Sequence, residues 1–138
     1  LPKRWVANKK NVENYVNLDL DKTYNLNLFF EYIELNIRKN EKKKDEIVTS
    51  FLNEITKNVL VNDQTLVKAG EDNFLFSFFS IEDNEGKKFK NHIWYRICVK
   101  DLKLLIVSFV FSYELKSKII GEVYYSKINE CIKSSELN

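Results

Sequence analysis

Glycine and proline are scarce in this chain of 138 residues, which has three Gly and one Pro. That scarcity excludes collagen-like repeats and Gly-rich linkers. There is no Met, and one His and two Cys are too few for most metal sites or for a disulfide framework. A net charge of +2 is too small to predict nucleic acid or an acidic membrane surface as a partner.

Aromatic residues are plentiful by contrast, at 14% of the chain, and hydrophobic residues reach 44%. This composition predicts a single domain over 1–138 with a sizeable core. The longest uncharged stretch, Leu104 to Tyr113, has ten residues, about half of what a membrane-spanning helix needs. Because the chain starts at Leu1 without Met, we expect a processed or trimmed product. It is expected to be cytoplasmic unless a signal segment was removed before Leu1.

Alternating apolar residues predict strands in the N-terminal third. The runs 12–20 and 24–32 both alternate, and Asp21-Lys22 is a plausible hairpin turn between them. A helix is expected next, with Asn40 as its N-cap and Asn62-Asp63 at its end. Its apolar stripe has three- and four-residue spacings and consists of Val48, Phe51, Leu52, Ile55, Val59 and Leu60.

Strand patterns return over 66–69, 74–79, 89–99 and 102–113, with a hairpin tip at 83–86. The strand 102–113 is apolar on both faces, as a covered central strand would be. Ser117 can cap a last helix. The predicted buried stripe of this helix is Ile120, Val123, Tyr124, Ile128, Cys131 and Ile132. The expected fold class is therefore α+β, with a single antiparallel sheet flanked by helices on both faces, a three-layer α/β/α sandwich.

This order of elements resembles the PsbP-like superfamily, which includes photosystem oxygen-evolving subunits, Ran-binding nuclear import factors and uncharacterised bacterial domains. The opening Leu1–Trp5 looks like the superfamily's L-P-x-x-W start. The segment 92–96 followed by 104–109 looks like its aromatic strand beside a very apolar one, and 121–134 resembles its closing helix. The resemblance implies a protein-binding role and carries over no catalytic residue.

Candidates for chemistry are few. His92 is the single imidazole, and a catalytic role would need a nucleophile or carboxylate held beside it. No nucleophile motif is present, so catalysis by His92 is not expected. Cys98 and Cys131 lack CxxC spacing, and zinc would need about four ligands. Cys131 is expected to pack as a small hydrophobe on the apolar stripe, and a disulfide between the two stays a minor alternative.

Two charged segments are candidate binding sites. One alternative for Lys42, Lys43 and Lys44 is contact with phosphate, but the acidic residues around them favour a solvated helix entry. The acidic hairpin tip is the most projecting charged feature, and such a loop can enter a basic groove. Its members are Glu82, Asp83 and Glu85.

These observations favour a non-enzymatic protein-binding module with no catalytic, cofactor or metal residues. Lys outnumbers Arg nineteen to three, which suggests an AT-rich bacterial genome. By analogy of size and fold, the expected role is a toxin-neutralising immunity protein or a secretion-effector chaperone. The predicted partner-binding residues are the hairpin acids together with Trp94 and Arg96. The alternatives are an accessory subunit of a larger complex, or a small-ligand carrier or enzyme with a cleft walled by Trp94, Arg96 and Tyr113.

Overall fold

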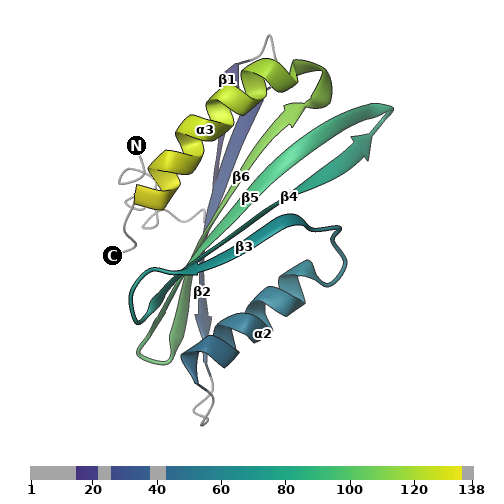
Figure 1. Cartoon of the computed structure of the whole chain (residues 1–138). Helices are drawn as coiled ribbons and strands as arrows, with labels where there is room; N and C mark the ends of the chain where they lie inside the picture. Colours follow the sequence, from purple (N-terminus) through teal and green to yellow (C-terminus); the bar gives the residue numbers. More distant parts are fainter. Residues whose placement is uncertain (1–14, 22–25, 38–42, 135–138) are drawn as a thin grey trace.

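A computed structural model describes residues 15–21, 26–37 and 43–134 of the chain. These residues form one six-stranded sheet and two α-helices (Figure 1). The elements in chain order are β1 (Tyr15–Asp21), β2 (Leu26–Asn36), α2 (Lys44–Thr56), β3 (Asn62–Lys68), β4 (Asn73–Asn84), β5 (Lys87–Lys100), β6 (Lys103–Glu114), a 3-10 turn η2 (Leu115–Ser117) and α3 (Lys118–Ser134).

The sheet is antiparallel throughout, and its strand order is β1-β2-β6-β5-β4-β3. Among the described strands, β3 and β1 are therefore the two edges. The β4–β5 hairpin turns at Glu85 and Gly86, which have φ of 54° and 80°. Two positive φ values in a two-residue loop suit the right-handed twist of the flanking strands. The hairpin tip predicted at 83–86 is confirmed, and Figure 1 shows it projecting beyond the neighbouring strands.

Alternate residues of β6 enter two separate hydrophobic clusters. Val107 and Phe109 belong to a cluster that includes Ile128 and Ile132 of α3. Leu104 and Ile106 belong to the other, which contains apolar residues of α2. Because successive strand residues point to opposite faces, the two clusters lie on opposite sides of the sheet. The doubly apolar pattern of β6 is thus explained by burial on both of its faces.

The prediction of a three-layer α/β/α sandwich is wrong, because the molecule is mostly sheet. Six strands about 4.8 Å apart span roughly 24 Å, whereas one helix is only about 10 Å wide. The two helices have 13 and 17 residues, and each packs against part of the sheet without forming a layer (Figure 1). The hydrophobic pattern of the helices identified a buried stripe but could not indicate how much of the sheet that stripe covers.

The predicted helix boundaries also need correction. Helix α2 ends at Thr56, and Leu60, which was assigned to its stripe, is 76% exposed. The chain leaves the helix early because β3 begins at Asn62 and pairs with β4. Asn40, the predicted N-cap, lies outside the described residues, as do Lys22 and the segment Leu1–Trp5. Ser117 ends η2 immediately before α3.

The buried stripe of α3 is narrower than predicted. Ile128 and Ile132 are buried, whereas Val123 is 48% exposed and Cys131 is exposed as well. The expectation that Cys131 packs in the core is wrong, because this side of α3 faces away from the sheet. Within the described ranges, neither α2 nor α3 combines the length and apolarity that a membrane crossing requires.

Candidate functional site

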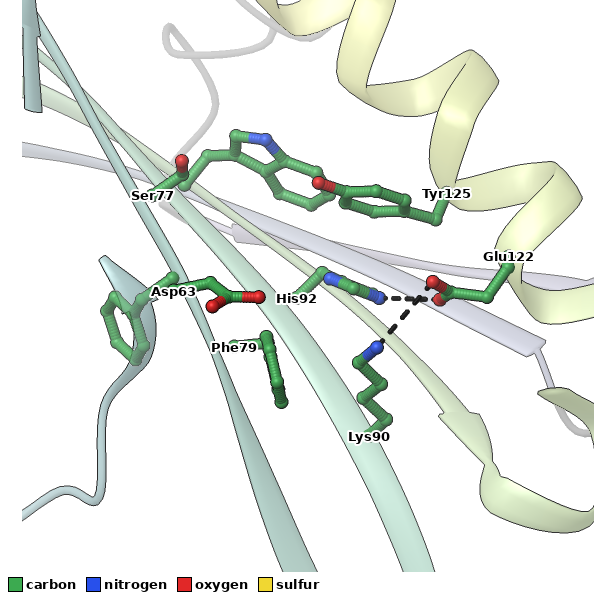
Figure 2. A pocket seen from close by; sticks show the side chains of 9 residues that line it. Asp63, Ser77, Phe79, Lys90, His92, Glu122 and Tyr125 are labelled. Carbon is green, nitrogen blue, oxygen red and sulfur yellow. Dashed lines mark hydrogen bonds and ion pairs between the residues drawn. The ribbon is translucent and has the colours of Figure 1, made fainter. Parts of the chain in front are cut away.

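A pocket of about 130 Å³ lies between α3 and strands β3, β4 and β5 (Figure 2). Its walls combine acidic, basic and aromatic side chains from four elements that are far apart in the sequence. The lining residues are Asp63, Ser77, Phe78, Phe79, Lys90, His92, Trp94, Glu122 and Tyr125.

Glu122 on α3 is the polar centre of this pocket. One of its oxygens, Oε2, lies 2.9 Å from Nε2 of His92 and also accepts a hydrogen bond from the Tyr113 hydroxyl. The other oxygen lies 3.6 Å from the Lys90 ammonium. The Glu122 carboxylate thus contacts three sheet residues, namely Lys90 and His92 of β5 and Tyr113 of β6. It links α3 to both strands. We call Glu122 with these three residues the Glu122 clasp.

Burial and the hydrogen bond to Glu122 shift the pKa of His92 in opposite directions. Burial lowers the pKa of His92 and outweighs the hydrogen bond to Glu122, which would raise it. Burial alone would raise the pKa of Glu122, but the bonds from Tyr113 and His92 and the charge of Lys90 hold that pKa below its usual value. At neutral pH the clasp therefore contains an ionised Glu122 carboxylate and a neutral His92 imidazole.

Aromatic rings cover His92 and close the back of the pocket. The Tyr125 ring stacks on the His92 ring at a centroid distance of 3.8 Å and lies 5.8 Å from the Trp94 ring. Trp94 Nε1 donates to Oδ1 of Asn129 at 2.9 Å, so the buried indole N–H has a hydrogen-bond acceptor on α3. The spacing 122, 125 and 129 places Glu122, Tyr125 and Asn129 on one side of α3.

Asp63 forms the opposite wall of the pocket, on the edge strand β3. It has φ of 50° and lies where the pairing of β3 with β4 shifts register, between Asn62 and Thr65. Its carboxylate points toward His92, with Glu122 on the far side of the imidazole (Figure 2). In the described part of the chain, no hydrogen bond or ion pair is found for Asp63. Between the two acids, the Lys90 ammonium lies 4.3 Å above the ring of Phe79.

The predicted residues Trp94 and Arg96 lie under α3, with 1% and 9% exposure. Arg96 Nη1 donates to the carbonyl of Ile132 at 3.2 Å, near the end of α3, where a positive charge is favourable. Tyr113 is fully buried. In this conformation the three side chains hold α3 against the sheet, and Trp94 also lines the pocket. Contact of Trp94 and Arg96 with a partner stays a prediction.

The acidic hairpin residues are separate from the pocket. Glu82, Asp83 and Glu85 are all exposed at the β4–β5 tip. Asp83 is directly opposite Lys88 across the hairpin, so its field is partly offset by a neighbouring positive charge.

The remaining candidates from the sequence are dispersed. Cys98 is buried and Cys131 exposed, and both are free thiols. Lys44 forms an ion pair with Asp72, and Lys43 is exposed just before α2, whereas Lys42 lies outside the described residues. Over the ranges that the structure describes, no group of three His, Cys, Asp or Glu side chains could hold a metal ion.

Sequence reasoning singled out His92 but missed its carboxylate partner. Glu122 is thirty positions away, and no motif links it to His92. A usable signal was present in α3, where the helical spacing of Glu122, Tyr125 and Asn129 continues the buried stripe with polar and aromatic groups. Asp63 carried no signal, because it was assigned to a helix end.

No family model and no curated protein matches the chain. The solved structures that share its fold include two of low sequence identity. One is LpqN, described as involved in cell envelope biogenesis of Mycobacterium tuberculosis, with a TM-score of 0.58 and 8% identity over 82% of this chain. The match covers 65% of that chain, less than two thirds of its length. The other is PA94 from Pseudomonas aeruginosa, a protein of unknown function and putative regulator, with a TM-score of 0.54, 8% identity, and coverage of 89% of this chain and 81% of that one. At this identity the likeness extends to the fold alone.

Proposed function

We propose that this chain is a non-enzymatic protein-binding module that pairs its edge strand β3 with an extended segment of a partner protein. The observation that carries the proposal is the exposure of β3. Among the strands that the structure describes, β3 pairs with β4 alone, and every residue from Asp63 to Lys68 is exposed. Unpaired backbone groups on an edge strand are a template for strand addition by another chain.

The side chains of β3 also favour a partner. Leu66 and Val67 are 48% and 54% exposed, and as neighbours in a strand they lie on opposite faces of the sheet. A partner strand beside β3 would cover both and remove apolar surface from water. The charged residues of β3 are Asp63 and Lys68, near its two ends, so the middle of the edge is only weakly protected against pairing.

The geometry of the pocket supports a binding role over catalysis. His92 has the carboxylate partner that a catalytic imidazole needs, but its side chain is 6% exposed and its ring lies under Tyr125. Glu122 accepts hydrogen bonds from two sheet residues at once, which suits a structural role in holding α3 against the sheet. A volume of about 130 Å³ is also well below the roughly 300–1,000 Å³ of ordinary small-molecule pockets, which weighs against a carrier.

Within this proposal, the chain is a secretion-effector chaperone or a toxin-neutralising immunity protein. An edge strand suits an extended client segment, which favours the chaperone, whereas a projecting hairpin suits the folded face of a toxin. Membership of the PsbP-like superfamily is part of the proposal, and the shared fold of LpqN and PA94 supports a common architecture. A cytoplasmic location is likewise proposed, with the cell envelope as the alternative that the description of LpqN suggests.

A paired substitution tests the role of the edge. Val67→Lys places a charge on β3, and Leu102→Lys is its control, because Leu102 is 53% exposed in the distant β5–β6 turn. Proteins retained from the source lysate are identified by mass spectrometry and remade in pure form, and their affinities for the unaltered chain and both variants are then measured by calorimetry. We expect Val67→Lys to weaken binding of the purified partner at least tenfold and Leu102→Lys to leave it unchanged.

Two results would count against the proposal. Equal binding by both variants would show that β3 is not part of the interface. Loss of binding when Glu82, Asp83 and Glu85 are changed to Lys would then place the interface at the hairpin. Retention of a small molecule, with no protein partner, would favour the carrier.

A further inference from the structure

We propose that the pocket beside β3 receives a Lys or Arg side chain from the extended partner segment, and that Asp63 is the residue that selects it. This inference rests on the proposed function, since it specifies the sequence of the segment that pairs with β3. It assigns a ligand class to the pocket, namely one cationic side chain.

The position of Asp63 connects the edge to the pocket. Asp63 belongs to β3 and also lines the pocket, with its carboxylate directed toward His92 (Figure 2). A strand added to β3 would lie about 4.8 Å away, and every second side chain would face the α3 side of the sheet. The four-carbon stem of a Lys, or the similar length of an Arg, is enough to carry a positive group past Asp63 into the pocket.

The charges of the pocket complement a cation. The carboxylate of Glu122 is already matched by Lys90 and accepts hydrogen bonds from His92 and Tyr113. Asp63 has no such partner among the described residues, so the pocket is left with one negative charge that is not offset. A Glu side chain in the same place would meet two carboxylates, and an aliphatic one would cover Asp63 without pairing it.

The aromatic walls suit the same ligand. The Lys90 ammonium lies 4.3 Å above the ring of Phe79, so the face of this ring already contacts one cation. Tyr125, stacked on His92, provides a second ring on the α3 side. A volume of about 130 Å³ equals that of roughly four water molecules, which is room for an ammonium or guanidinium head and part of its stem.

Four peptides test the selection. Each has seven residues, to match the length of β3, with alternating Thr and Val, blocked ends and Lys, Arg, norleucine or Glu at the centre. Binding is measured by calorimetry at low salt, and the indole resonance of Trp94 in the pocket is followed by NMR. The Asp63→Asn variant removes the charge and keeps the positive φ, which Asn tolerates. Asp101→Asn removes an exposed charge in the β5–β6 turn, at a residue whose φ is also 50°, and is the matched control.

We expect the Lys and Arg peptides to bind about tenfold more tightly than the norleucine peptide, a typical gain for one desolvated charge pair. The Glu peptide should bind most weakly. Asp63→Asn should abolish the preference, and Asp101→Asn should retain it. Equal binding of all four peptides would overturn selection by Asp63 and leave pairing at β3 intact. Failure of all four to bind would overturn the proposed pairing at β3 and the selection together.

Discussion

Gly121 is the position where the packing of α3 on the sheet can be tested most directly. It is buried on the side of the helix that faces Tyr113, and an added Cβ would lie 2.6 Å from Cγ of that ring. Carbon atoms in contact are normally about 3.5–4.0 Å apart, so Gly121→Ala creates an overlap of roughly 1 Å. The ring cannot move aside easily, because Tyr113 is fully buried and its hydroxyl donates to Glu122.

Two effects of opposite sign compete in this variant. Helix propensity favours Ala over Gly by about 1 kcal/mol in a helix interior. Overpacking a buried contact costs about 1–3 kcal/mol, and the cost here lies toward the upper end because Cβ meets three atoms at the base of the ring. We therefore expect a net loss of about 1–2 kcal/mol in the free energy of unfolding. For a domain of this size, the melting temperature should fall by roughly 4–8 °C.

Urea unfolding of Gly121→Ala measures this balance, with the midpoint compared at constant slope. Ser126→Ala is the control, since Ser126 is exposed on the same helix and should gain about 0.5 kcal/mol from propensity alone. A gain in stability for Gly121→Ala would refute the reasoning, because it would mean that helix propensity outweighs contact with Tyr113. A loss without change in the far-UV spectrum would support the close approach of α3 to β6.

Three further outcomes are expected. Val107, at 2% exposure, should not tolerate Asp, and Val107→Asp should lower the free energy of unfolding by several kcal/mol; a melting shift of only a degree or two would contradict its burial. His92 is the one histidine of the chain, and its folded-state pKa is lowered by burial. The unfolded chain therefore takes up a proton at higher pH than the folded one, so stability should decline as pH falls below about 6.5, and less steeply in His92→Gln. Cys131 should react with a thiol reagent in the native protein and Cys98 only after denaturation; simultaneous reaction would contradict the burial of Cys98.

Local patterns predicted the kinds of elements better than their extents. The alternation in 24–32 and 89–99 and the doubly apolar run 102–113 identified three strands, because burial of one or both faces gives each strand its own local residue pattern. The end of α2 was misplaced, since Val59 and Leu60 fit the helical stripe by spacing alone. The pairing of β3 with β4 sets that boundary, and a helical repeat contains no information about pairing.

The candidate site was predictable only in part for the same reason. The unique His92 stood out by its rarity, but its partners Glu122, Tyr113 and Lys90 lie on three different elements. Trp94 and Arg96 were predicted to contact a partner from their residue types. They are buried because α3 packs over them. Residue types alone do not indicate where on the sheet that helix packs.

The sequence by itself determined the apolar alternation of the strands, the helical stripes, the hairpin tip at 83–86 and the absence of recognisable nucleophile motifs, because each of these depends on residues close together in the chain. Only the tertiary structure decided that β3 lies at the edge of the described sheet, that the two helices cover parts of the sheet instead of forming layers, and that Glu122 meets His92. The physical reason is that edges, coverage and clustered charges are set by contacts between distant segments. Many arrangements satisfy the same local pattern, and packing selects among them.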